Sequence, residues 1–550
     1  MAMSSRVSEA KLHPEWIRWV LPSASDLFFV ALLGVLVFTA LSVRLLGDAG
    51  IGWHIRTGQL ILRTHSVPRV DPFSSSMSGQ PWFAWEWLYD VVVGWLEGAA
   101  GLNGVVLFTA SVIAATFALT FRMLLQRGTN ILVAAMLVLL AASSAMIHFL
   151  ARPHVLSWLF TVIWFWILES SEQSSIHSAS HPSSEAPRSW RLWFLPSLTL
   201  GWVNVHGGFL VGFALLAIYW IGAVWRSLKH RGDRFDEILA KIRAGQRLRM
   251  LTWIGVLSAA ATFVNPYGYQ LHIHIYQYLT NRFLMDRIDE FQSPNFHYVA
   301  QKCFAGLLLL TLIACASRRR ADKRVSVTDG LILLFAVYSG LYASRNIPVS
   351  AILLAAIIGP WLSEATDRLG ESRWAGVRER YRRLASFLHR MQSMEFSLRG
   401  HIGAVAAILF ACWVAAHGGQ LGSTVLMNAH FDGKRFPIDA TDYLEKQEAT
   451  GPFFSPDDWG GYLIYRMYPR AKVVVDDRHD MYGEKFLRSY LTTIHIEPGW
   501  EDFLQQYPAN FVIVPKKSAL ANLLAETTGW HLTYGDDVAL VFVRVQDASQ

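Results

Sequence analysis

Residues suited to chemistry gather in a short stretch that follows the first long apolar segment. Asp48 comes directly after that segment, His54 and Arg56 lie at the start of an amphipathic run, and Asp71 precedes a proline. A carboxylate can act as a general base or hold a metal ion, and a guanidinium matches the oxygens of a phosphate. An acid, an imidazole and a guanidinium at the edge of an apolar segment therefore predict a site at a membrane surface.

Aromatic residues continue this stretch, and Glu86 lies among them. The tryptophans are Trp53, Trp82, Trp85 and Trp87. Tryptophan stacks on sugar faces, but it also favours the bilayer interface for purely physical reasons, so both interpretations stay open here. For Asp48 the structural alternative is a solvated helix end, and for Asp71 it is the turn that an Asp-Pro pair favours.

Three more candidates lie beside later apolar segments. His154 follows an Arg-Pro pair and could bind a metal ion, relay a proton or simply lie at a helix end. His206 is followed by two glycines at a helix junction, where a packing role is the alternative. Arg345 is a lone cation between two apolar segments. Because a cation near lipid is costly, it requires a partner, either a phosphate or a buried carboxylate.

The elements that must position these residues are membrane helices. The chain has 550 residues, of which 53% are hydrophobic and 17% charged, whereas soluble domains are about a quarter charged. Almost charge-free stretches near membrane-spanning length recur at Asp26–Leu46, Gly104–Phe121, Ile131–Phe149, Val155–Leu168 and Gly207–Trp225. This pattern predicts a polytopic α-helical membrane protein and excludes a disulfide scaffold, a fibre and a disordered chain.

Basic residues predict the orientation of the chain. They concentrate in three segments between apolar spans, at Arg226–Arg249, Arg318–Arg324 and Arg368–Arg399. Loops of this kind usually face the cytoplasm, so we expect no nucleic-acid partner. Eleven spans, or thirteen if residues 86–100 also cross and one other segment is split, would place the N-terminus in the cytoplasm and the C-terminus outside.

These spans divide the chain into three expected parts. Residues 1–25 are a cytoplasmic segment, residues 26–418 are a transmembrane domain whose first outside loop covers 47–84, and residues 419–550 form an outside domain. In this last part, strand-length apolar runs alternate with helical stretches, which predicts a small α/β domain with a largely parallel sheet. The expected helices are Ala440–Gln447, Glu484–Leu491, Trp500–Gln506 and Ser518–Thr527.

Three apolar runs are the expected strands of that domain. They are Lys472–Val475, Phe511–Val514 and Val538–Val543. The polar cluster Asp476–Asp480 follows the first of them, at the strand end where α/β sheets usually bind ligands. This cluster could alternatively hold the domain to the membrane part by ion pairs.

A first span, an acid, an amphipathic stretch and a Trp/Pro-rich entry to the next helix resemble the GT-C class of membrane glycosyltransferases. The segment Asp48–Glu86 is most similar to the lipopolysaccharide-core galacturonosyltransferase-like branch, through uncharacterised bacterial members. The resemblance implies a GT-C-like fold in a bacterial inner membrane, with the C-terminal domain in the periplasm. His154 departs from the class, because many relatives have an aspartate where it follows Arg-Pro.

The resemblance also implies a reaction and its residues. A sugar would pass from a polyprenyl-phosphate donor to a lipid, glycan or protein acceptor on the periplasmic face, with inversion at the sugar. Asp48 would activate the acceptor, and Arg345 or Arg56 would stabilise the leaving phosphate. Asp71, Glu86, His154 and His206 are the further substrate-binding candidates. No cofactor is certain, and a divalent metal ion is a candidate.

Two other functions are compatible with a chain of this composition. One is a multi-span transporter or lipid flippase, although no pair of broken helices repeats along the sequence, as it does in many transporters. The other is a non-enzymatic membrane assembly protein whose outer domain recruits partners. An enzyme predicts that Asp48, Arg56, Glu86 and Arg345 converge on one outward cavity, whereas a scaffold does not.

Overall fold

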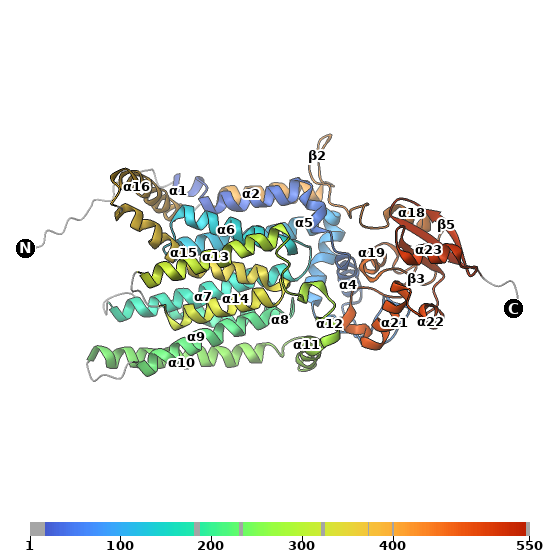
Figure 1. Cartoon of the computed structure of the whole chain (residues 1–550), viewed down its shortest axis with the longest axis horizontal. Helices are drawn as coiled ribbons and strands as arrows, with labels where there is room; N and C mark the ends of the chain where they lie inside the picture. Colours follow the sequence, from blue (N-terminus) through green and yellow to red (C-terminus); the bar gives the residue numbers. More distant parts are fainter. Residues whose placement is uncertain are drawn as a thin grey trace, which may run out of the picture.

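The apolar runs form long helices that pack side by side, because a membrane helix satisfies its backbone hydrogen bonds internally. The computed structural model describes residues 17–180, 188–229, 235–320, 325–371, 373–398 and 401–545. Figure 1 shows an elongated helical bundle with the C-terminal residues as a separate body at one end. Most of the expected cytoplasmic segment, residues 1–25, lies outside the described ranges.

Seven helices of the described chain are long and apolar enough to cross a membrane, and an eighth is added if the bent pair Ala375–Ser397 and Ile402–Ala416 is one span. The seven are Arg18–Phe38, Trp87–Gln126, Ile131–His148, His154–Gln173, Phe209–Lys229, Val299–Arg318 and Ser344–Asp367. This number is lower than the expected eleven because other bundle helices are short or begin with charged turns. They are α8 (Phe194–Val203), α10 (Phe235–Ala261), α14 (Val327–Tyr342) and α17 (Ile402–Ala416).

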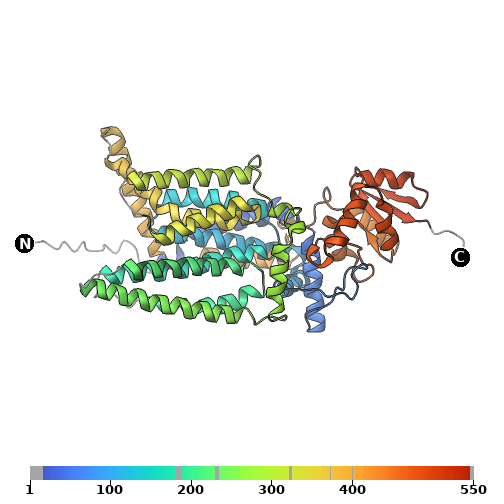
Figure 2. The same ribbon diagram turned by 60° about the horizontal axis from the view of Figure 1, so that its bottom comes forward.

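The basic segments lie at one end of the bundle and the C-terminal domain at the other. Figures 1 and 2 show the end of α9 (Phe209–Lys229), the start of α10 and the basic helix α16 (Ala375–Ser397) far from that domain. Such a separation is what the positive-inside rule predicts for a protein with its outer domain on the opposite side.

The first outside loop forms an amphipathic helix that lies between the bundle and the C-terminal domain. After α2 (Ala24–Phe38) and α3 (Leu41–Leu45), helix α4 (Gly50–Thr64) packs tightly on the start of α5 (Trp87–Gln126). Glycines allow the approach, since a Cβ on Gly58 would overlap the carbonyl group of Asp90. The helical dihedral angles of α5 break at Ala100 and Gly101, so residues 87–99 form a separate first half.

The C-terminal domain contains a mixed four-stranded sheet in the order β3-β4-β6-β5. Its strands are β3 (Phe453–Phe454), β4 (Phe511–Pro515), β5 (Trp530–Gly535) and β6 (Ala539–Arg544). Only β3 and β4 are parallel, and β6 pairs antiparallel with both β4 and β5. The expectation of a largely parallel sheet is wrong, because a tight turn rather than a crossover helix joins β5 to β6.

Helices cover this sheet where the sequence predicts them, at α18 (Ile438–Lys446), α21 (Glu484–His495), α22 (Trp500–Gln506) and α23 (Ala519–Glu526). The expected strand Lys472–Val475 forms only isolated bridges. Val473 pairs with Phe453 of β3 on one side and with Ser74 of the first outside loop on the other. The outside loop therefore adds backbone pairing to the edge of the C-terminal sheet.

Glycines also let the C-terminal domain approach the first outside loop closely. Helix α19 (Asp457–Met467) packs on α4, and a Cβ on Gly461 would overlap the carbonyl oxygen of Ala49. Equally, a Cβ on Gly52 would overlap the carbonyl oxygen of Gly461. The backbones of the two helices thus meet without intervening side chains, which fixes the C-terminal domain on the first outside loop.

We expect Gly461→Ala to destabilise this interface by about 1–3 kcal/mol or more, because the new methyl group has no space. The thermal unfolding midpoint in detergent should fall, and limited proteolysis should cut between the two parts. Gly529→Ala is the matched control, since a Cβ there meets no atom within 4 Å. Equal midpoints for the two variants would show that the helices do not meet as described.

Candidate functional site

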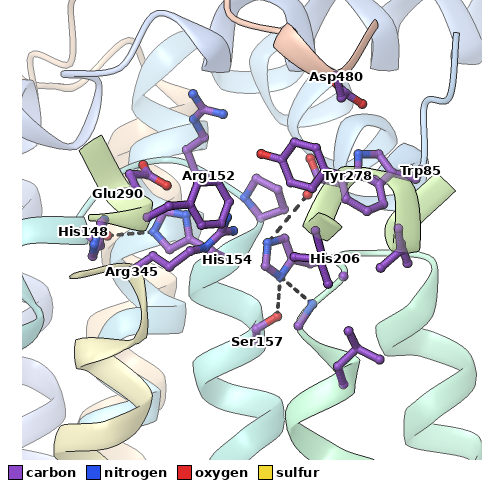
Figure 3. Close-up of a pocket in the computed structure, with 18 of the residues that line it drawn as sticks. Trp85, His148, Arg152, His154, Ser157, His206, Tyr278, Glu290, Arg345 and Asp480 are labelled. Atoms are coloured by element: carbon purple, nitrogen blue, oxygen red, sulfur yellow. Dashed lines mark hydrogen bonds and ion pairs between the residues drawn. The ribbon is translucent and has the colours of Figure 1, made fainter. Parts of the chain in front are cut away.

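A cavity of about 510 Å³ lies where the outer ends of the helices meet the C-terminal domain. It is lined by aromatic side chains and by an unusual number of ionisable ones. The ionisable side chains are Glu86, Asp90, His148, Arg152, His154, His206, Tyr278, Glu290, Tyr342, Arg345, Asp477, Arg478 and Asp480. Figure 3 shows that they come from several elements, with Asp480 reaching in from the C-terminal domain.

Four of the residues that the sequence singles out line this cavity together: Glu86, His154, His206 and Arg345. Helix starts and junctions position them, since Glu86 is the N-cap of α5 and His154 is the first residue of α7 (His154–Ser180). Arg345 lies in the single turn η4 (Ser344–Asn346) before α15 (Ile347–Asp367). Asp48, Arg56 and Asp71 are not lining residues.

Asp48 contacts the cavity wall through Arg152. One terminal nitrogen of Arg152, Nη2, donates to Asp48 Oδ1 and to Asp477 Oδ2, at 2.7 Å each. Asp477 also accepts a 2.9 Å hydrogen bond from the Trp53 indole. Burial raises the pKa of Asp477 to about 6, although Arg152 opposes the shift. This cluster joins the first loop, the start of α7 and the C-terminal domain.

Arg56 and Asp71 hold the C-terminal domain at other points. Arg56 Nε donates to the carbonyl oxygen of Tyr465 at 2.7 Å, on the outer side of α4. Asp71 is buried and accepts a 2.8 Å hydrogen bond from Arg478, which also donates twice to Asp476. The Asp476–Asp480 segment therefore has both of the roles that the sequence leaves open, since it anchors the domain and contributes side chains to the cavity.

Glu86 is placed between two imidazoles. Its two oxygens lie 3.8 Å from His54 Nε2 and 3.8 Å from His206 Nε2, respectively. The carboxyl group does not cap its own helix. Burial raises the pKa of Glu86 to about 8, even though Arg152 favours the charged form. Glu86 is therefore a protonated carboxyl at neutral pH, poised to ionise slightly above it.

Hydrogen bonds fix the tautomer of His206. The backbone N–H of Gly208 donates to His206 Nδ1 at 3.0 Å, so this nitrogen carries no hydrogen. The Ser157 hydroxyl accepts from the Trp202 indole and donates to the same Nδ1, at 2.8 Å in each case. Burial lowers the pKa of His206 well below its usual value. His206 is thus neutral, and its only N–H, at Nε2, faces Glu86.

Arg345 lines this cavity without a direct carboxylate partner among the described residues. Its guanidinium lies 4.4 Å from the centre of the Phe291 ring and makes no hydrogen bond or ion pair with any described residue. Burial would raise the pKa of nearby Glu290, but Arg345, His148 and Arg152 hold it at about 2. Figure 3 shows Arg345 and Glu290 on the same side of the cavity. An anionic group of a ligand could therefore bind Arg345 directly.

The described residues contain no cluster of three or more His, Cys, Asp or Glu side chains arranged to hold a metal ion. No step of the reaction is assigned to a metal ion.

Sequence reasoning did not select Arg152 or Asp90, and it named His54 only as part of the first-loop pattern, without a role of its own. Arg152 lies in the same Arg-Pro-His string as His154, so the local sequence does contain a signal for it. His54 looks like one face of an amphipathic helix, and its partner Asp90 is 36 residues away. No local pattern indicates that pair.

The raised pKa of Glu86 gives a pH-dependent prediction for stability. Its folded-state pKa of about 8 exceeds the ordinary value of 4.5, so the unfolded chain ionises first as pH rises. Glu86→Gln should match the wild type near pH 4.5, become more stable than it between about 4.5 and 8, and keep that advantage above 8. Thermal unfolding at about pH 5, 7 and 9 measures this difference, with the exposed Glu501→Gln as control. A constant difference at the three pH values would contradict the assignment.

No family model matches the chain, and no curated protein matches it. Among solved structures it is similar to the oligosaccharyltransferase of Archaeoglobus fulgidus in the apo form, with 13% identity, 98% of this chain and 75% of that chain covered, and a TM-score of 0.54. It is also similar to the archaeal oligosaccharyltransferase AglB from Archaeoglobus fulgidus in complex with an inhibitory peptide and a dolichol-phosphate. The identity is 13%, the match covers 95% of this chain and 73% of that chain, and the TM-score is 0.56. ArnT from Cupriavidus metallidurans in the apo state is 15% identical. The match covers 94% of this chain and 97% of that chain, with a TM-score of 0.49. The chain has the GT-C fold that the first loop predicts, with a small sheet-containing domain at its C-terminus.

Proposed function

We propose that this protein is an integral membrane glycosyltransferase that moves a sugar from a polyprenyl-phosphate donor to an acceptor on the outer face of the membrane. Of the four residues whose convergence an enzyme predicts, Glu86 and Arg345 line the cavity, Asp48 contacts its wall through Arg152, and Arg56 lies elsewhere. The observation that carries the proposal is the convergence of Glu86 and Arg345, together with His206, on one cavity. This cavity combines a carboxyl group for an acceptor hydroxyl with a cation for a leaving phosphate, as glycosyl transfer from a lipid phosphate requires.

The cavity also has an apolar side suited to a lipid chain. Leu210 of α9 and Leu279 of α11 (Gln270–Thr280) line it and are 43% and 46% exposed, respectively. Exposed leucines at the outer end of a membrane bundle face lipid. A polyprenyl chain could therefore lie against these leucines while its phosphate contacts Arg345.

Other lining residues of the cavity suit a polar acceptor. Asp477 and Asp480 of the C-terminal domain line it, and Trp85 and Tyr278 present aromatic faces. Carboxylates bind hydroxyl groups, and flat apolar rings pack on sugar faces. In this assignment the membrane domain binds the donor and the C-terminal domain contributes to the acceptor site.

The similar archaeal structure contains a dolichol-phosphate together with an inhibitory peptide. The binding of a dolichol-phosphate by that protein supports a lipid-phosphate ligand here. Within the class we place the chain in the galacturonosyltransferase-like branch, on the resemblance of Asp48–Glu86. We also place it in a bacterial inner membrane, with the C-terminal domain in the periplasm.

In the proposed reaction an acceptor oxygen attacks the anomeric carbon, and polyprenyl phosphate leaves with inversion at the sugar. Arg345 stabilises the charge that develops on the phosphate. Glu86 takes the acceptor's proton when its carboxyl group is ionised, because it faces the cavity and its pKa of about 8 lies near neutrality. Asp48 is the activating carboxylate that the sequence favours, but its Oδ1 already accepts from Arg152 and from the backbone of Gly50. We assign it to holding Arg152.

The donor site can be tested without knowing the sugar. Undecaprenyl phosphate added to the purified protein should be retained in native mass spectrometry, and Arg345→Ala should weaken retention about tenfold or more. Arg287→Ala is the matched control, since Arg287 is exposed on the same side of the membrane and lies over the Phe283 ring. Equal retention by wild type and Arg345→Ala would contradict the donor site. Retention of bulk phospholipid alone would favour a transporter or an assembly protein.

Release of free polyprenyl phosphate from a panel of synthetic polyprenyl-phosphate sugars tests the reaction itself. With bacterial envelope lipids as acceptors, Glu86→Gln should lower the rate about 100-fold or more. Asp48→Asn should have a smaller effect, about tenfold or less, because Asp477 still holds Arg152. The opposite ranking would return the activating role to Asp48, and no release by the wild type from any donor would sink the proposed function.

A further inference from the structure

We propose that α16 lies in the membrane interface at the basic end of the bundle and binds anionic phospholipids of the cytoplasmic leaflet. This inference goes beyond the proposed function, because it concerns the end of the protein that is remote from the cavity. It is carried by the contacts that hold α16 to the membrane helices and by the order of apolar and basic side chains around it.

The C-terminal half of α16 is fixed to the ends of two membrane helices. Buried Glu395 accepts a hydrogen bond from the backbone N–H of Ala24, the first residue of α2, at 2.5 Å. Gln392 donates to the carbonyl oxygens of Leu125, in the last turn of α5, and Thr129, at 3.4 and 3.2 Å. Because one membrane helix begins and another ends here, this part of α16 lies at the boundary between hydrocarbon and water.

The direction of α16 suits a helix that lies along the membrane. It is inclined by 64° to α17, the apolar helix that follows it. Figures 1 and 2 show it at the end of the bundle opposite the C-terminal domain. Five arginines among its 23 residues make it too charged to cross hydrocarbon. The interface is the place that fits both its direction and its composition.

One flank of α16 is apolar although the rest of the protein does not cover it. Leu388 and Glu395 are buried, whereas five apolar side chains on the adjoining flank are 40–51% exposed. These five, called the apolar stripe below, are Val377, Leu384, Phe387, Met391 and Met394. They follow one another at intervals of seven, three, four and three residues, so they form one line along the helix. At a membrane boundary such a line contacts lipid chains.

Arginines border the apolar stripe. Arg380 precedes Phe387 by seven residues and lies in the stripe itself, and Arg390 follows Phe387 by three, at its edge. Both guanidinium groups are exposed and make no hydrogen bond or ion pair with any described residue. The nearby acid Glu379 pairs instead with Arg383, at 3.0 Å. The charges of Arg380 and Arg390 therefore have no carboxylate partner within the helix.

This combination fits a phospholipid with net negative charge. An arginine side chain packs its methylene groups on apolar surface and keeps its guanidinium at the level of the headgroups. Acyl chains would contact the apolar stripe, while the lipid phosphate contacts Arg380 and Arg390. Clusters of arginine on an amphipathic helix are attracted to anionic lipid in this way. The opposite flank of α16, with Arg382, Ser386 and Ser393, is exposed and polar and faces water.

Arg382 supplies the matched control for a binding experiment. It lies two residues from Arg380, hence roughly 200° around the same helix, and it is also exposed. Phosphatidylglycerol is titrated into the purified protein and its binding is measured by native mass spectrometry. Arg380→Gln and Arg390→Gln should each weaken binding about fivefold, and Arg382→Gln should leave it nearly unchanged. Phosphatidylethanolamine, which has no net charge, should bind all four proteins alike.

Equal phosphatidylglycerol binding by Arg380→Gln, Arg390→Gln and Arg382→Gln would overturn the headgroup contact. Because these side chains are exposed on the helix surface, the substitutions should not change the thermal unfolding midpoint. None of the measurements requires transfer of a sugar. Failure of this inference is therefore distinguishable from failure of the proposed function.

Nitroxide labels test the position of the apolar stripe in nanodiscs that contain phosphatidylglycerol. Leu384→Cys and Ser386→Cys are labelled separately, after serine replaces the native cysteines Cys303, Cys315 and Cys412. The ratio of oxygen to nickel-complex accessibility should be about threefold or more higher at position 384, because oxygen concentrates in hydrocarbon and the complex in water. Equal ratios at the two positions would overturn the membrane contact. Shielding of position 384 from both reagents would instead indicate a protein partner or a second copy of this chain, and would equally overturn it.

Discussion

The guanidinium of Arg152 is the point at which three distant parts of this protein meet. Asp48 follows the first span, Asp477 belongs to the C-terminal domain, and both carboxylates accept from the same nitrogen of Arg152. Two carboxylates that approach this closely in a poorly hydrated place would repel each other without a cation between them. This shared ion pair lies in the cavity wall and holds the C-terminal domain there, together with the Asp71–Arg478 pair and the backbone contact between Gly461 and Ala49.

Glu86 shows how differently the same functional group behaves a short distance away. It contacts imidazoles rather than guanidinium groups, so burial dominates and it retains its proton to about pH 8. Surroundings rather than residue type therefore separate the carboxyl groups of this site into those that hold the structure and one that can exchange a proton. The site is built from this contrast.

The sequence predicts features that depend on neighbours along the chain. The helix Trp500–Gln506 has the expected bounds, and four predicted site residues share the cavity because each lies at an outer helix end. Contacts between residues far apart in the sequence produce no local pattern of this kind. Arg152 and Asp477 are 325 residues apart, and nothing local links them. The sequence does not predict β5, since its partly exposed residues lack the apolar run of the neighbouring strands.

The bond between Asp71 and Arg478 has a consequence for how the chain is made. These partners are 407 residues apart, so the first loop is translated long before the residue that neutralises Asp71. At about 5–20 residues per second, the wait on the ribosome is tens of seconds. During that time the loop lacks its strand partner at Val473 as well. The site is therefore not complete until the C-terminal domain has been made and has docked on the loop.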